Sequence, residues 1–219
     1  MKFPKSFRPE KDLDKKIEEL INLDKNLDKS FERPNPGAVK RLLDSCEEYV
    51  EIINSKSDSR GVNREAYYLA KRMDYTLEDL KILAQCFRVR DDTYLDVGFY
   101  LSSMTNKVVP EWGSTTLVVN EALNGIGAFL KNISLTIEGN VYCFAGAHML
   151  EGELIIKGNS GLFTGYGMSG GEIIVKGNCG INTGCLMKGG ILRVEGNIER
   201  IFDNCQGTVY QKGEQVRPR

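Results

Sequence analysis

Apolar residues in the first hundred positions of the chain recur every three or four residues, which is the spacing of amphipathic helices. The first stripe predicts a helix over residues 10–31, which ends before Pro34 and Pro36 because proline cannot continue a helix. Its apolar positions are Leu13, Ile17, Leu20 and Leu27. A second stripe predicts another helix, which ends at the polar run 55–61. Its apolar positions are Val39, Leu42, Leu43, Cys46, Val50 and Ile53.

The next segment predicts a helical hairpin around Thr76. Its first helix carries an apolar set made by Ala66, Leu69, Ala70 and Met73. The Thr76 hydroxyl can cap the second helix, and Asp79 stands at the capping-box position three residues later. Asp92 or Thr93 can then cap one more short helix, in which Gly98 is an unfavourable residue. Together these patterns predict a small bundle of four or five helices.

Residues 122–197 consist of a nineteen-residue pattern that repeats four times without a gap. The rows are ALNGIGAFLKNISLTIEGN (122–140), VYCFAGAHMLEGELIIKGN (141–159), SGLFTGYGMSGGEIIVKGN (160–178) and CGINTGCLMKGGILRVEGN (179–197). With positions numbered as columns within a row, glycine occupies column six throughout and Gly-Asn ends every row. A fixed period near twenty is typical of a solenoid, in which each repeat forms one coil that stacks on the next.

Individual columns predict how each coil is built. Columns fourteen and sixteen are apolar in all four rows, and this alternation predicts a strand with these side chains facing inward. The ladder consists of Leu135, Ile137, Leu154, Ile156, Ile173, Val175, Leu192 and Val194. Glycine in column six predicts a turn with a positive φ or close backbone packing. The Gly-Asn columns predict a second corner, with an asparagine ladder that bonds from coil to coil.

Both ends of the repeat region depart from the pattern. Residues 115–119 predict an irregular entry coil before the four rows. Residues 198–210 predict a degenerate last coil with Asp203 in column six. A solenoid needs caps at such ends, because the terminal strands otherwise leave unpaired edges. We therefore expect the helical part to cover the amino-terminal end.

The distribution of glycine divides the chain into two parts. Of its 23 glycines, only Gly37 and Gly61 precede residue 96. We predict an α-helical domain over residues 1–105 and a β-solenoid domain over residues 106–219, so the chain is of the α+β class with the two kinds of structure in separate domains.

Charge and cysteine content narrow the classes of function. The 29 Lys and Arg residues nearly cancel the 30 Asp and Glu residues, so no strong net field favours nucleic acid or an anionic membrane as a partner. No stretch approaches the roughly 18 apolar residues of a membrane span. The six cysteines are too scattered for a secreted disulfide scaffold and include no CxxC pair. Reduced thiols and a cytoplasmic location are expected.

Three groups of residues are candidates for chemistry, and each has a simpler structural interpretation. The segment 165–170 matches the GxGxxG dinucleotide fingerprint, but a strand is expected after it where the fingerprint needs a helix. The only histidine, His148, has no second histidine with which to hold a metal. Stacking can bring together the thiols Cys143, Cys179, Cys185 and Cys205, yet buried thiols are common core residues. We predict no catalytic, cofactor-binding or metal site.

The aromatic residues give two expectations about surfaces. Tyr67, Tyr68 and Phe87 in the helical part are expected to be half-buried packing residues, because tyrosine at helical spacing usually packs this way. An exposed row around Tyr166 in the coils would suit a protein interface.

The segment GNSGLFTGYGMSGGEIIVKGNCGINTGCLMKGG resembles the GXGXG repeat domain found at the carboxyl end of the large glutamate synthase polypeptide and in one subunit of formylmethanofuran dehydrogenase. The resemblance covers residues 113–210. It implies a right-handed parallel β-helix. It also implies a scaffold that docks against catalytic domains or subunits and is not itself the seat of catalysis. Residues 1–105 match neither family.

These observations leave several functions open. The leading hypothesis is a non-catalytic scaffold that docks a partner protein or a second copy of itself. A second is an accessory subunit of a glutamate-synthase-like or formylmethanofuran-dehydrogenase-like complex. A third is a polysaccharide-cleaving β-helix enzyme with clustered carboxylates, although the coil acids form only a solvated edge. Those acids are Glu138, Glu153, Glu172 and Glu195. A left-handed hexapeptide solenoid is disfavoured because the rows show no period of six.

Overall fold

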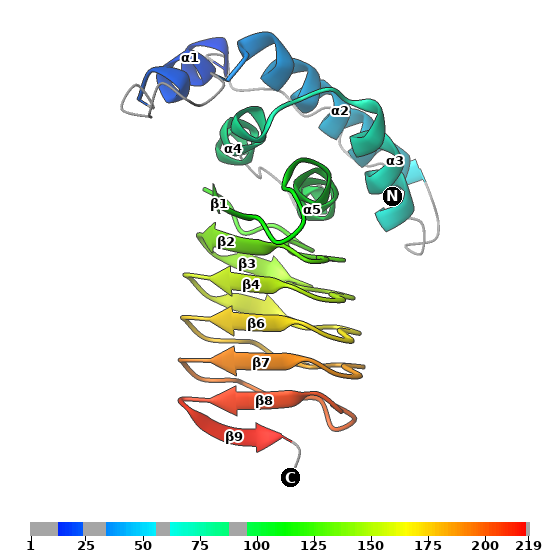
Figure 1. Ribbon diagram of the computed structural model, residues 1–219, viewed down its shortest axis with the longest axis vertical. Coiled ribbons are helices and arrows are strands. Elements are labelled where there is room, and N and C mark those ends of the chain that lie inside the picture. The colour runs from blue at the N-terminus through cyan, green and yellow to red at the C-terminus, as the bar shows by residue number, and fades with distance from the viewer. Residues whose placement is uncertain (1–12, 24–33, 56–61, 88–95, 218–219) are drawn as a thin grey trace.

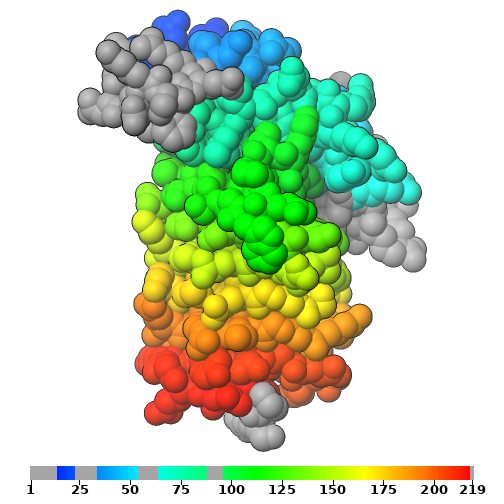
Figure 2. Space-filling model, viewed as in Figure 1, coloured from blue at the N-terminus to red at the C-terminus, as the bar shows by residue number. Residues whose placement is uncertain are grey.

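The computed structural model describes residues 13–23, 34–55, 62–87 and 96–217 and shows helices stacked on one end of a β-solenoid (Figure 1). The helices are α1 (Leu13–Leu23), α2 (Pro36–Ser55), α3 (Val62–Arg72), α4 (Leu77–Cys86) and α5 (Val97–Val108). In the space-filling view the helical residues lie directly on the coils and the whole molecule is an elongated stack (Figure 2). The described residues therefore contain the predicted helices followed by the predicted solenoid.

The helices begin where local chemistry allows. The α1 helix lies within the predicted range 10–31, whose remainder falls outside the described residues. Pro36, expected to interrupt a helix, instead starts α2, because the first helical position needs no N–H donor. The Asn35 side chain accepts hydrogen bonds from the backbone N–H groups of the residues that follow Pro36. Asn35 is therefore the N-cap of α2.

The predicted capping box at the start of α4 is confirmed. The Asp79 N–H donates to Thr76 Oγ1 over 3.2 Å, and the Thr76 N–H donates to Asp79 Oδ2 over 3.0 Å. The predicted caps Asp92 and Thr93 lie outside the described residues, and α5 begins at Val97 with Asp96 at its N-cap position.

The strands of the solenoid lie within the described range 96–217. They are β1 (Ser114–Val118), β2 (Ser134–Glu138), β3 (Val141–Cys143), β4 (Glu153–Ile156), β5 (Ser160–Leu162), β6 (Glu172–Val175), β7 (Ile191–Val194), β8 (Thr208–Gln211) and β9 (Glu214–Arg217). The main sheet has the order β1-β2-β4-β6-β7-β8-β9 and is parallel up to β8, while β3 and β5 form a second parallel pair. Leu154 pairs with Ile173 and Ile173 with Leu192, so the nineteen-residue period is the coil length.

The predicted core ladder is confirmed. All eight side chains of columns fourteen and sixteen are at most 2% exposed. Their burial is the main stabilising term of the coils, at about 1.5–3 kcal/mol for each aliphatic side chain. The buried apolar residues of the helices and the coils form one contiguous cluster. Two separate domains and a self-contained helical bundle stay predictions.

Both predicted corners are present. The column-six glycines Gly127, Gly146, Gly165 and Gly184 all have φ between 63° and 77°. At the other corner each asparagine N–H donates to the asparagine Oδ1 of the preceding coil over 2.8 Å. This ladder consists of Asn140, Asn159, Asn178 and Asn197. The ladder satisfies polar groups at an edge that would otherwise rely on water.

The last coil differs from the sequence-based register. Ile191 pairs with Thr208, so this coil has seventeen residues where the coils from β2 to β7 have nineteen. The Phe202 N–H donates to Thr183 O, as column-six glycines do to the preceding coil, and the Cys205 N–H then donates to Phe202 O. Asp203 is therefore not in column six, and its assignment there was wrong because one of the two residues missing from this coil falls before that column, as the pairing of Thr183 with Ile201 shows.

A hairpin that the sequence analysis did not predict closes the carboxyl end. The β9 strand returns antiparallel to β8 through Lys212 and Gly213, which have φ of 51° and 85°. Two consecutive residues with positive φ are typical of the type I′ turn, whose twist suits a two-residue hairpin. A short charged strand thus forms the last edge of the sheet, which discourages pairing with other chains.

At the amino-terminal end, α5 takes the place of a preceding coil, as expected for the helical part. In lower coils a column-six N–H bonds to a carbonyl of the coil before it, as Gly146 does to Ile126. The coil of residues 122–140, called the first coil from here on, has no such carbonyl. Its Gly127 N–H donates instead to Ser102 Oγ over 2.8 Å. Gly98 allows this approach, because a Cβ there would lie 2.2 Å from Asn124 O. The unfavourable helical glycine is thus required by packing.

We expect Ser102→Ala to destabilise the protein by about 1–3 kcal/mol, because the buried Gly127 N–H would lose its acceptor. Urea unfolding followed by circular dichroism measures this free energy. Ser103→Ala, one position along the same helix, is the matched control and should change stability by less than about 0.5 kcal/mol. Equal stabilities of the two variants would contradict the capping role of Ser102.

Candidate functional site

A groove of about 800 Å³ lies where α3 and α5 meet the first coil. Aromatic, aliphatic and basic side chains line it together. They are Arg64, Tyr67, Tyr68, Ala70, Lys71, Ser103, Asn106, Lys107, Val109, Glu111, Phe129, Lys131 and Ile133. The groove exists because α3 packs on α5, and α5 in turn lies on the coil that carries Phe129.

The aromatic wall of the groove is exposed. Tyr67 and Tyr68 are each 55% exposed and Phe129 is 38% exposed, whereas Phe87 is 2% exposed. The two tyrosine rings meet edge to face, with centroids 5.7 Å apart. The expectation of half-buried packing was therefore wrong for both tyrosines, because no element covers this face of α3 in the described part of the chain.

Two contacts hold Phe129 in place. It has a φ of 57°, and its carbonyl accepts a hydrogen bond from Asn106 Nδ2 over 3.2 Å. Its ring stacks on His148 of the next coil, with centroids 5.1 Å apart. Below His148 stands Gly167, where a Cβ would lie 2.7 Å from the imidazole. The absence of a side chain at Gly167 leaves room for the imidazole of His148, and the ring of Phe129 stacks on that imidazole.

Four basic residues and one acid line the groove. The Lys107 ammonium donates to the carbonyls of Ala70, Lys71 and Met73, which lie at the carboxyl end of α3, and so caps that helix. Lys71 Nζ lies 5.9 Å from the centroid of the Tyr67 ring. Lys107 is therefore structural, while the charge of Lys71 stands at the aromatic wall.

His148 belongs to a packed aromatic edge of the coils. Its ring meets Tyr166 edge to face at 5.3 Å, and Tyr166 also contacts Phe144 and Phe163. Burial, and secondarily the positive charge of Lys188, lower the pKa of His148. The neutral imidazole therefore dominates at pH 7 and serves as a stacking surface.

The four coil thiols pack as small core residues. All are buried and free of disulfides. Burial raises the pKa of Cys143, Cys185 and Cys205, and it raises the pKa of Cys179 to about 12. Protonated thiols are poor nucleophiles. No group of three or more potential metal-ligating side chains occurs in the ranges that the structure describes.

Three of the four coil carboxylates make ion pairs at the edge that was expected to be solvated. Glu138 pairs with Lys157 over 2.5 Å, and Glu195 pairs with Lys176. Glu172 pairs with Arg193 over 2.5 Å. The GxGxxG segment is likewise a coil turn, because β6 follows it as expected and no helix does.

Comparison of the chain with family models, with curated proteins and with solved structures gave no match. Among the described residues, no helix combines the length and apolar character needed to cross a membrane.

Proposed function

We propose that the protein is a non-catalytic scaffold that docks a partner protein in the groove between its helices and its first coil. The observation that carries the proposal is the exposed aromatic wall made by Tyr67, Tyr68 and Phe129. Tyrosine is enriched among the residues that dominate binding energy at protein interfaces. These rings stand on packed helices and coils, so little ordering cost opposes their burial by a partner.

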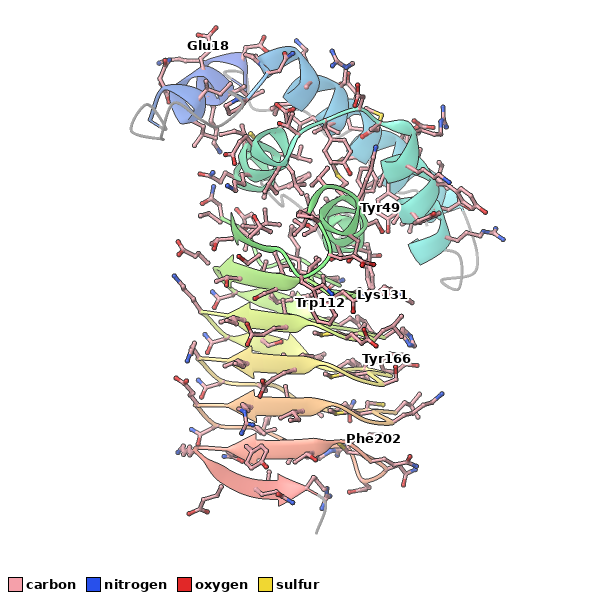
Figure 3. The ribbon with its side chains drawn as sticks, in the orientation of Figure 1. Glu18, Tyr49, Trp112, Lys131, Tyr166 and Phe202 are labelled. Carbon is pink, nitrogen blue, oxygen red and sulfur yellow. The ribbon has the colours of Figure 1, made fainter. Side chains whose placement is uncertain are left out.

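Trp112 extends this surface. It is 76% exposed and has a φ of 62°, a backbone conformation that is costly for a bulky side chain. The backbone N–H of Trp112 donates a hydrogen bond to Asn132 O, which holds the loop in this conformation. Trp112 and Lys131 lie near the junction of helices and coils (Figure 3). A strained and exposed tryptophan beside a groove supports a docking role.

The proposal includes the type of solenoid and a second candidate function. The in-register glycine columns resemble the GXGXG repeat, and that resemblance implies a right-handed β-helix. The same columns support an accessory subunit of a glutamate-synthase-like or formylmethanofuran-dehydrogenase-like complex as the second candidate. In that case the docked partner would carry the catalytic groups. A second copy of the chain is the alternative occupant of the groove.

Light scattering after size-exclusion chromatography, with mass spectrometry, tests the docking function on untagged protein from native cells. We expect a stable complex with a named partner. Tyr67→Ala combined with Tyr68→Ala should weaken that complex about thirtyfold or more, which is the effect of losing one interface hot spot. Tyr142→Ala is the control, because Tyr142 is 51% exposed on β3 and does not line the groove. Recovery of a lone monomer, or an unchanged complex in the tyrosine variant, would reject the proposal.

A further inference from the structure

We infer that the groove takes an acidic segment of the partner chain that also carries apolar side chains, an inference that rests on the docking function proposed above. The lining holds four basic residues and one acid, although the whole chain has a net charge of −1. The groove lining is therefore net positive in a chain that is nearly neutral. Complementary charge of this kind selects partners and speeds their association.

Two of the four basic residues have their charge available. Arg64 faces Glu65 at 3.6 Å, and Lys107 is occupied by the carbonyls of α3. Within the ranges that the structure describes, neither Lys71 nor Lys131 has a carboxylate within ion-pair distance. Lys71 stands on α3 and Lys131 on the first coil, so they flank the aromatic wall from both elements.

The rest of the lining explains why the segment must also be apolar. Tyr67, Tyr68 and Phe129 offer more exposed ring surface than charged side chains alone would cover. Apolar side chains that pack there exclude water, which strengthens the attraction between a carboxylate and the flanking lysines. Anionic side chains and apolar side chains on one segment thus reinforce each other.

The shape of the groove favours an extended peptide over a small molecule. Small-molecule pockets enclose most of their ligand, whereas the wall tyrosines are each 55% exposed.

Fluorescence anisotropy with synthetic peptides tests the inference on the full chain. One peptide alternates Glu with Leu and Phe, a second has Lys in place of Glu, and a third has Glu with Ser only. We expect the first peptide to bind at least about tenfold more tightly than either of the others. Its affinity should fall as NaCl rises from about 0.05 M to about 0.3 M, because salt screens the lysines.

The control variant changes a lysine in the same column as Lys131 but in a different coil. Lys71→Glu combined with Lys131→Glu should weaken the first peptide at least about tenfold. Lys188→Glu is the control, because Lys188 occupies the same column as Lys131 three coils away and is also exposed. Failure of the first peptide to bind, tighter binding of the basic peptide, or equal loss in the control variant would each overturn the inference.

The same variants separate this inference from the proposed function. If Lys71→Glu with Lys131→Glu leaves the native partner complex intact while the tyrosine variant dissociates it, the partner docks in the groove but its segment is not acidic. If neither variant weakens the native complex, the groove is not the docking site and both proposals fail. Weakening by both variants supports both.

Discussion

Gly161→Ala is expected to destabilise the protein by about 3 kcal/mol or more, the largest effect of any single methyl group in the coils. A Cβ at this position would lie 1.8 Å from the carbonyl oxygen of Tyr142 in the neighbouring coil. The obstructing atom belongs to the backbone of a paired strand, so it cannot rotate away as a side chain could. The two coils would have to separate locally, which breaks strand hydrogen bonds and opens the core.

Thermal and urea unfolding measure this effect against Gly165→Ala in the same coil. Gly165 has a φ of 73°, but the nearest atom to its added Cβ is 3.8 Å away. Alanine there should cost only the backbone strain of about 1–2 kcal/mol. The Gly161 variant should lower Tm by roughly 6–12 °C, given about 2–4 °C for each kcal/mol in a chain of this size. A smaller loss of stability for the Gly161 variant than for the Gly165 variant would show that the two coils can move apart at little cost.

Asp79→Ala is the second large expected loss, at about 3 kcal/mol. The carboxylate is 2% exposed and accepts three hydrogen bonds, from Asn35 N over 2.6 Å, Thr76 N over 3.0 Å and Thr76 Oγ1 over 2.9 Å. Asn35 is itself the N-cap of α2. One buried anion thus fixes the starts of both α2 and α4, and its charge is also favoured at the amino end of α4.

Thr76→Ala is the control for this position. It removes one cap and should cost about 1 kcal/mol, whereas the Asp79 variant leaves three partly buried donors without their acceptor. Urea unfolding gives both free energies, and hydrogen exchange shows whether the amides at the start of α2 lose protection together with those of α4. Loss of protection confined to α4 would mean that Asp79 does not couple the two helices.

The proposed docking site depends on both parts of the chain. The helices supply Tyr67, Tyr68 and Lys71, while the first coil supplies Phe129 and Lys131. The lower coils carry neither the groove nor the tyrosine pair, but they share a continuous core with the helices. In the proposed arrangement the solenoid is the base, and the α3–α5 pair and the first coil together form the docking surface.

The nineteen-residue repeat by itself determined most of the solenoid. Inward-facing columns, the positive φ of column six and the asparagine ladder all follow from rules that act within one coil or between identical positions of adjacent coils. The Thr76–Asp79 cap is equally local and was confirmed. The sequence predicts such features because residues in one column have equivalent neighbours in every coil.

Other features depend on contacts that no local pattern encodes. The last coil is two residues short, and only its hydrogen bonds to the preceding coil place Phe202 in column six, where Asp203 was expected. Phe144 and His148 have φ of 58° and 53°, and Asn182 and Leu186 in the same columns have φ of 60° and 55°, so the turns of the coil impose positive φ at positions where no glycine column predicts it. Gly98 looked like a defect in a helix until the close approach of the first coil explained it.

The sequence did not predict the candidate site, because the site also depends on contacts between distant segments. Helical spacing identifies an apolar face, but whether that face is covered depends on which other elements pack against it. The sequence pattern predicted that Tyr67 and Tyr68 are packing residues. In the structure they are exposed on α3 and line a groove together with Phe129, some sixty positions later in the chain. The repeat determined the solenoid, whereas tertiary packing alone created the groove, because its walls come from segments that share no local pattern.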